Sequence, residues 1–172
     1  HDYVFLQKPF DPTNTGGDTL ARNTDYRWNA WGTEYASSPR RLLTYSFSSR
    51  YGGYFGGQRL NLRGSVGYRF QPYAALALDV SYNDIRLPEP LKDATLWLVS
   101  PRLDLTFTNT LFLTTFVQYN NQLDNVNLNV RLQWRYQPAS DLFIVYTSNH
   151  NPDGFGLKSQ ALVFKLTYWL NV

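Results

Sequence analysis

The sequence contains no cysteine and no methionine among its 172 residues. Without cysteine, the chain can form neither disulfide bonds nor thiolate metal sites, and it lacks a thiol nucleophile. Charged residues are also scarce, at 17% of the chain, against about 25% in an ordinary soluble domain. The net charge is only +3, and no basic helix or RNA-binding motif is present, so we expect no nucleic-acid partner.

Long apolar runs are absent as well. The mean hydropathy is −0.40, and no apolar stretch reaches the roughly 18 residues of a membrane-spanning helix, which excludes such a helix. Aromatic residues, in contrast, make up 17% of the chain, with 13 tyrosines and 5 tryptophans. A membrane protein of this composition would have to be a β-barrel, because only every second residue of its strands faces lipid.

The clearest pattern lies in residues 126–137, which read VNLNVRLQWRYQ. Apolar or aromatic residues alternate strictly with polar ones, as in a strand with one apolar and one polar face. A strand of this length, tilted by ~45°, covers roughly 28 Å, which is close to the thickness of a hydrocarbon core. The polar face carries Asn, Gln and Arg rather than the dense mixed charge of a soluble surface, which favours a lumen.

Eight further stretches have strand-like patterns, separated by polar segments or by segments rich in Gly and Pro. Short connections alternate with longer ones, such as 51–57 and 84–93, as between the periplasmic turns and extracellular loops of an up-and-down barrel. This arrangement would place the C-terminus in the periplasm. Residues 1–24 read as an irregular segment or extracellular loop, with a possible end of an earlier strand at 2–7. The eight stretches are 25–35, 43–51, 60–70, 74–82, 95–107, 111–121, 142–148 and 159–172.

The number of predicted strands is nine, whereas bacterial single-chain barrels have an even number. The chain also starts at His1 without a signal peptide, although an outer-membrane protein must be exported. We therefore expect residues 25–172 to form the C-terminal nine strands of a larger, even-stranded, antiparallel transmembrane β-barrel in a Gram-negative outer membrane.

The alternation assigns side chains to the two sides of the barrel wall. Together with Arg50, the lumen candidates carry seven positive and two negative charges, which would favour anions in an open lumen. The same charges could instead form a hydrogen-bonded plug with Asn and Gln. The lumen-facing candidates are Arg63, Arg69, Asp79, Arg102, Asp104, Arg131, Arg135 and Lys165. The lipid-facing candidates are Leu128, Val130, Leu132, Trp134, Leu162, Phe164 and Leu166.

Aromatic residues cluster near the ends of the predicted strands. Amphipathic rings favour both membrane interfaces, so we expect two aromatic belts, although aromatic residues are also good strand formers in general. The stretch YGGYFGG at 51–57 reads as a flexible hairpin tip with interfacial tyrosines, or as exposed rings that could stack on sugars. The interfacial candidates are Tyr51, Tyr54, Tyr82, Tyr119, Tyr136 and Tyr168.

Several longer motifs carry a resemblance to a known family: RYGGYFGG (50–57), GSVGYRFQPY (64–73), SYNDIRLP (81–88), FVQYNNQLDNVNLNVRLQWRYQPASDLFIVYT (116–147) and ALVFKLTYWLN (161–171). With these motifs, residues 25–172 resemble the C-terminal barrel region of Bacteroidota-type outer-membrane proteins. Those proteins carry a carbohydrate-binding-module family 9-like domain, followed by a barrel domain of unknown function. The resemblance implies an earlier barrel portion upstream of His1 and a function related to glycans. It implies no catalytic residues.

Chemistry-bearing residues are few. The stretch NHNPDG at 149–154 faintly resembles the start of a calcium loop, but Gln160 stands where a bidentate Glu would be required. His150 lies close to Asp153 in sequence, which leaves a rim active site open as an alternative. We predict no catalytic residue, cofactor or metal site.

The resulting expectation is a porin-like outer-membrane barrel that acts as a channel, a scaffold or a surface-binding component of a complex. Its expected partners are outer-membrane lipids and lipopolysaccharide, with other outer-membrane proteins or glycans as further candidates. Two alternatives remain at this point: an outer-membrane barrel enzyme with an active site at the rim, and a soluble lipocalin-like barrel that binds ligands among inward-facing apolar residues.

Overall fold

The computed structural model, which describes residues 1–170, shows an all-β chain. Within these residues no helix is long and apolar enough to cross a membrane. Eleven strands are present. They are β1 (Asp2–Phe5), β2 (Asp25–Trp28), β3 (Ala30–Ala36), β4 (Leu43–Tyr54), β5 (Gly57–Phe70), β6 (Ala74–Arg86), β7 (Ala94–Thr106), β8 (Leu111–Asn120), β9 (Asn125–Gln137), β10 (Ser140–His150) and β11 (Leu157–Thr167).

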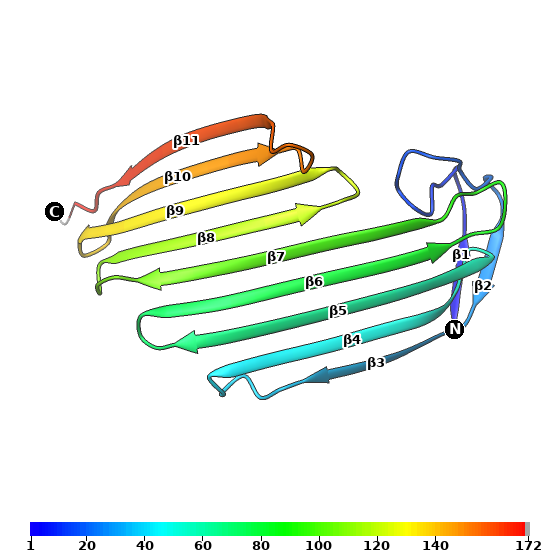
Figure 1. Cartoon of the computed structure of the whole chain (residues 1–172), viewed down its shortest axis with the longest axis horizontal. Helices are drawn as coiled ribbons and strands as arrows, with labels where there is room; N and C mark the ends of the chain where they lie inside the picture. The colour runs from blue at the N-terminus through cyan, green and yellow to red at the C-terminus, as the bar shows by residue number, and fades with distance from the viewer. Residues whose placement is uncertain (171–172) are drawn as a thin grey trace.

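Nine of these strands, β3 to β11, form one antiparallel sheet in chain order (Figure 1). Each strand pairs with the strand before it and the strand after it, so the sheet is a continuous meander. Across residues 1–170, β3 and β11 each have one neighbour only, and the sheet is therefore open. The predicted all-β antiparallel architecture is confirmed, whereas a closed barrel is not formed by these nine strands alone.

Most strands extend further than the sequence pattern indicated. β4 continues through Tyr54 and β5 begins at Gly57, so only Phe55 and Gly56 connect them. Both residues have positive φ angles, of 47° and 84°, as in the type I′ turns that suit tight hairpins. The prediction of a long loop at 51–57 is therefore wrong, because Gly52, Gly53 and Gly57 belong to strand pairs.

The predicted alternation of short and long connections is also weaker than expected. Connections at one end of the sheet comprise residues 37–42, 71–73, 107–110 and 138–139, and those at the other end comprise 55–56, 87–93, 121–124 and 151–156. Because the strands extend into the predicted loops, the two ends differ little in connection length. Loop length therefore gives little information about which end faces which compartment.

The predicted strand at 25–35 is broken at Asn29. Residues before the break form β2, which leaves the large sheet and pairs with β1 in a separate two-stranded sheet. Within residues 1–24, β1 lies in the stretch 2–7 where the possible end of an earlier strand was predicted, and a bridge between Phe10 and Leu20 was not predicted. At the other end of the chain, β11 stops at Thr167, short of the predicted 159–172 strand, of which residues 171–172 lie outside the described part.

The only cluster of buried apolar side chains in the described chain joins the N-terminal segment (residues 1–28) to the turn between β4 and β5. Its buried members are Leu6, Leu20 and Phe55. The Phe55 ring lies 4.8 to 5.3 Å, centroid to centroid, from the four rings of Phe10, Tyr26, Trp28 and Tyr54. Tilted and edge-on contacts of this kind add to the hydrophobic gain from burial. The hairpin tip is thus the anchor of the N-terminal segment.

A second feature of the β4–β5 hairpin lets the N-terminal segment lie close to it. A Cβ atom on Gly53 would lie 2.6 Å from Cβ of Trp28, so a larger residue cannot be accommodated without displacement. The Gly53 amide also donates a hydrogen bond to the carbonyl oxygen of Asn29, at 2.9 Å. The glycine-rich motif therefore permits close approach of the N-terminal segment rather than flexibility.

The loop after β1 is organised around Asp11. Its carboxylate accepts hydrogen bonds from the hydroxyl and amide of Thr13 and from the amides of Asn14, Thr15 and Gly16, at 2.7 to 2.9 Å. Desolvation opposes ionisation of this group, but the hydrogen bonds outweigh it and lower the pKa of Asp11 from 3.8 to about 2.

Replacing Phe55 by Asn tests the anchoring role. Asn tolerates a positive φ angle, so the turn remains while the buried ring is lost. We expect local stability of the N-terminal segment to fall by about 3 kcal/mol, which corresponds to roughly 100-fold faster amide exchange. Hydrogen exchange of residues 2–28 measures this. The control is Phe107→Asn, in an exposed connection at the other end of the sheet, which should leave amide exchange of residues 2–28 unchanged. Equal effects of the two substitutions on these residues would contradict the anchoring role.

The Asp11 loop should lose stability in acid. Because the folded-state pKa lies below the unfolded value, the contribution of Asp11 is complete above about pH 4. It is lost as the pH falls through the folded-state pKa of about 2. We expect amide protection of residues 13–16 to decline over this interval. In Asp11→Asn, amide protection of these residues should be lower than in the wild type at pH 6 and should change less with pH. Identical pH profiles of the two proteins would contradict this account.

Candidate functional site: the polar face of the sheet

The register of the nine-stranded sheet decides which side chains share a face. Directly paired residues on neighbouring antiparallel strands point to the same side. The pairings place the eight lumen candidates on one side, which we call the polar face, and the seven lipid candidates on the other, the apolar face. The polar-face candidates are Arg63, Arg69, Asp79, Arg102, Asp104, Arg131, Arg135 and Lys165. The apolar-face candidates are Leu128, Val130, Leu132, Trp134, Leu162, Phe164 and Leu166.

Amide and hydroxyl side chains form ladders across the polar face. Asn149 on β10 accepts hydrogen bonds from Asn125 and Asn127 on β9, at 3.2 and 2.9 Å, and donates one to Ser159 on β11 at 2.9 Å. One step further along the strands, Asn129 donates to Thr147 at 2.9 Å. These hydrogen bonds join three strands through side chains as well as through the backbone, and they keep the face polar without a high density of charge.

Charged side chains on the same face are partly paired. The Arg102 guanidinium donates to both oxygens of Asp104, at 2.9 and 3.2 Å, and the hydroxyl of Thr114 donates to the same carboxylate at 2.8 Å. Such bidentate geometry is the stronger kind of ion pair. The group spans β7 and β8 and fixes the position of one arginine near the middle of the face.

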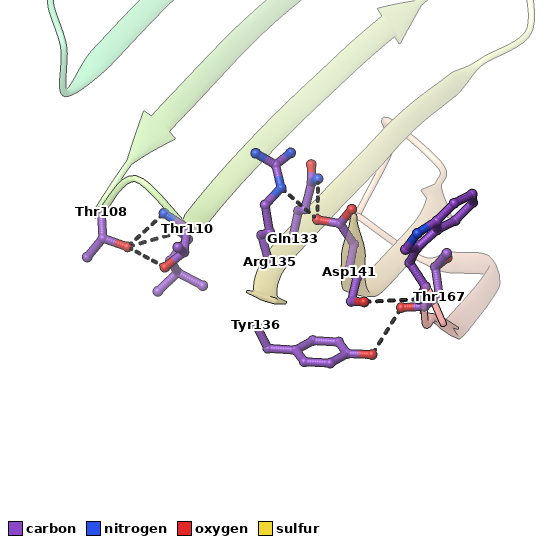
Figure 2. Close-up of polar contacts among 10 residues, drawn as sticks. Thr108, Thr110, Gln133, Arg135, Tyr136, Asp141 and Thr167 are labelled. Carbon is purple, nitrogen blue, oxygen red and sulfur yellow. Dashed lines mark hydrogen bonds and ion pairs between the residues drawn. The ribbon is translucent and has the colours of Figure 1, made fainter. Parts of the chain in front are cut away.

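A second group lies where β9 turns into β10. Figure 2 shows the side chains of Gln133 and Arg135 converging on the carboxylate of Asp141. Gln133 donates to Asp141 at 3.0 Å, and the Arg135 guanidinium is 3.4 Å away. On the opposite face, the Tyr136 hydroxyl donates to the carbonyl oxygen of Thr167 at 3.0 Å and thereby ties β11 to β9 across β10.

Sequence reasoning missed three charged residues of the polar face: Glu34, Arg59 and Asp141. Arg59 and Asp141 were overlooked because each lies just before the start of a predicted strand. Glu34 could have been found, since it alternates with Trp31, Thr33 and Tyr35 in sequence. With Arg50, the face carries eight positive and four negative side chains in the strands described, so it is less one-sidedly basic than predicted.

The apolar face has nothing packed on it in the described chain. Large apolar residues on it are extensively exposed, for example Trp31 at 83% and Phe164 at 64%. Contiguous apolar surface of this extent is rare on soluble monomers and marks contact with a membrane or a partner. The exposed residues are spread over almost all nine strands rather than gathered in one patch.

Aromatic side chains of the apolar face concentrate towards the two ends of the strands. Tyr82 and Trp97 form one cross-strand pair, with ring centroids 4.5 Å apart, and Trp134 and Tyr136 lie near the other end at 5.9 Å. The interfacial candidates Tyr51 and Tyr119 lie on the same face as Tyr82.

Two interfacial candidates lie elsewhere. Tyr54 is on the polar face, and its hydroxyl donates to the carbonyl oxygen of Pro12, at 3.1 Å, in the N-terminal segment. It is therefore an internal packing residue rather than part of an aromatic row. Tyr168 follows the last residue of β11 and is 59% exposed.

The surroundings of His150 differ from those predicted. Its Nε2 lies 3.1 Å from Oγ of Ser148, and its Nδ1 lies 3.3 Å from the carbonyl oxygen of Phe155, so it does not pair with Asp153. Ser148 is completely buried, which keeps its hydroxyl from substrates. Across residues 1–170 no three His, Asp or Glu side chains come together as a metal site would require.

Comparisons with known proteins add no assignment: no protein-family model matches the chain, and no curated protein matches it.

The Asn149 ladder gives a test of how the polar face is held together. Asn149→Ala removes three side-chain hydrogen bonds and leaves partners unsatisfied, so we expect a loss of about 1 to 3 kcal/mol in the free energy of unfolding. Equilibrium denaturation of the folded chain measures it. Gln118→Ala, on the same face of β8 and opposite Asn127, is the control and should cost less. An equal or smaller loss for Asn149→Ala would show that the ladder contributes nothing.

Proposed function

We propose that the nine-stranded sheet is part of the wall of a transmembrane β-barrel in a bacterial outer membrane, with the polar face towards a lumen and the apolar face towards lipid. The single observation that supports this most is the uncovered apolar face, which spans the sheet while the opposite face carries the hydrogen-bonded asparagine, glutamine and arginine side chains. A soluble barrel would need its apolar residues on the enclosed side, where they would be buried against one another.

Strand length supports the same proposal. β4 to β11 contain 10 to 14 residues each, whereas a tilted strand needs about 9–11 residues to cross a hydrocarbon core. The outer edges of β3 and β11 expose backbone groups that lipid cannot satisfy. The proposal therefore includes further strands that pair with these two edges and close the barrel wall.

The direction of the edge strands limits how closure can occur. In a meander of nine antiparallel strands, β3 and β11 run the same way. Antiparallel closure therefore requires an odd number of additional strands between them. A second copy in the same membrane orientation would place β11 beside a parallel β3, so a symmetric pair of these sheets does not make an antiparallel barrel. An even total also agrees with bacterial barrels in general.

The proposed role is that of a channel, scaffold or surface-binding component for small polar solutes, with outer-membrane lipids and lipopolysaccharide around the apolar face. The excess of arginine on the polar face favours anionic over cationic solutes. The resemblance described above extends the proposal to glycan-related solutes or partners. We place the C-terminus in the periplasm, which puts the N-terminal segment at the outer mouth of the lumen.

A matched pair of substitutions on adjacent residues of β9 tests the proposal. Leu128 lies on the apolar face and Asn129 on the polar face. Leu128→Arg should reduce stability in a bilayer by roughly 2 to 4 kcal/mol if that side chain faces lipid near the midplane, whereas Asn129→Arg should cost little. Folding into phosphatidylcholine vesicles, followed by urea titration, measures both. Equal costs would overturn the membrane assignment, and so would spontaneous folding of the full chain without detergent or lipid.

A further inference from the structure

A polar hollow of about 510 Å³ lies on the polar face at the end where the N-terminal segment is attached. Its walls come from β3, β4, β5 and β6. Arg50 on β4 is paired with Asn61 on β5, and Arg59 and Arg63 flank Asn61 on the same face of β5. Diagonal neighbours of this kind lie roughly 7–8 Å apart in Cα position. Three arginines thus lie next to one asparagine on the same face of the sheet.

The charges of the hollow are unevenly compensated. Arg59 lies over the Tyr54 ring, 4.3 Å from its centroid, which orients the guanidinium without neutralising it. Within residues 1–170, Arg63 makes no ion pair and no side-chain hydrogen bond. Glu34 is the one acidic residue lining the hollow; it lies in the same cross-strand row as Arg63, with Ser48 between them, and Asp79 on β6 is a diagonal neighbour of Arg63 on the same face. Among the acidic residues near the hollow in residues 1–170, only Asp2 forms an ion pair with one of the three arginines, and Arg59 and Arg63 remain without an anionic partner, which favours a negatively charged occupant.

The floor of the hollow is already arranged for hydrogen bonding. The side-chain amide of Asn61 donates to the side-chain oxygen of Asn83 at 2.6 Å. This bond fixes the orientation of both side-chain amides and leaves the side-chain NH2 of Asn83 available to a ligand. Ser48 on β4 also lines the hollow, so donors for hydroxyl or carboxylate oxygens are present on three strands.

One carboxylate already occupies part of this region. Asp2, in β1 of the N-terminal segment, forms an ion pair with Arg50 at 2.5 Å. Both side chains are partly exposed, so the pair is worth at most about 1 kcal/mol. A carboxylate held this weakly by one arginine, beside two arginines that have no anionic partner, is a group that a soluble carboxylate can displace.

We propose that the hollow binds a small polycarboxylate, with Arg59 and Arg63 as its main ligands, and that Asp2 competes with it for Arg50. Planar guanidinium groups bind carboxylates bidentately, which suits this donor set better than a single lysine would. The location of the site inside a lumen rests on the proposed barrel, but the binding chemistry does not. A solute entering from the side of the N-terminal segment would release Asp2 as it binds.

Isothermal titration calorimetry with citrate, on the full chain folded in a neutral detergent, tests the proposal. We expect Arg63→Gln and Arg59→Gln each to weaken citrate binding at least 10-fold, and Asp2→Asn to strengthen it about three- to tenfold. Lys165→Gln is the control, since Lys165 lies on the same face of the distant strand β11 and should leave the affinity unchanged. Neutral tricarballylamide, which has a similar backbone without the charges, should not bind.

Several results would overturn the site. These are the absence of measurable citrate heat in both wild type and Asp2→Asn, an equal loss for Lys165→Gln and Arg63→Gln, or weaker binding after Asp2→Asn. Circular dichroism of each variant establishes that the sheet is intact, so that loss of folding is not mistaken for loss of the site. The assay needs no bilayer. Failure of the vesicle experiment with Leu128→Arg would therefore count against the barrel and leave the citrate result standing.

Discussion

The pairing register of nine consecutive antiparallel strands is the constraint on which the other features depend. Because side chains alternate with a period of two, a slip of one residue in any pair would move a whole row of arginines and asparagines to the apolar side. The cross-strand hydrogen bonds of Asn127 to Asn149, of Thr114 to Asp104 and of Gln133 to Asp141 hold only in the observed register. Side-chain hydrogen bonds and the segregation of the two faces therefore stabilise the same register.

The parts of the structure that follow from local alternation could be predicted from the sequence. Eight of the nine predicted strands match single strands of the sheet, with errors confined to their ends, and the strand at 126–137 is reproduced almost residue for residue by β9. The end errors have a common cause. Glycine, asparagine and aspartate read as loop formers in sequence, but in Gly53 and Asn83 they are accommodated inside strand pairs whose neighbours supply the hydrogen bonds.

The N-terminal segment could not be predicted in the same way, because its structure depends on contacts distant in sequence. β1 and β2 fall within the stretches 2–7 and 25–35 in which strand was predicted, but their pairing with each other and the buried position of Phe55 depend on residues that are far apart in sequence. The candidate hollow is similarly non-local, since it combines side chains from four strands with an ion pair to Asp2. Alternation placed Arg50 and Arg63 on one face, but no pattern in the sequence places Asp2 above them.

The break at Asn29 has a consequence for how the sheet is made. Every pairing within the nine strands joins consecutive elements, so the sheet has low contact order and can assemble by successive addition of hairpins. The chain before β3, however, turns away from the sheet plane into β2 instead of continuing as the next strand. In the proposed barrel, the strand that pairs with the free edge of β3 would therefore not be the segment directly before β3, and would come from another part of the sequence or from another molecule. Where that strand belongs to the same chain, pairing it with β3 would close a loop at an entropic cost that the hairpins of the sheet do not pay, so this seam of the proposed barrel would form after the meander.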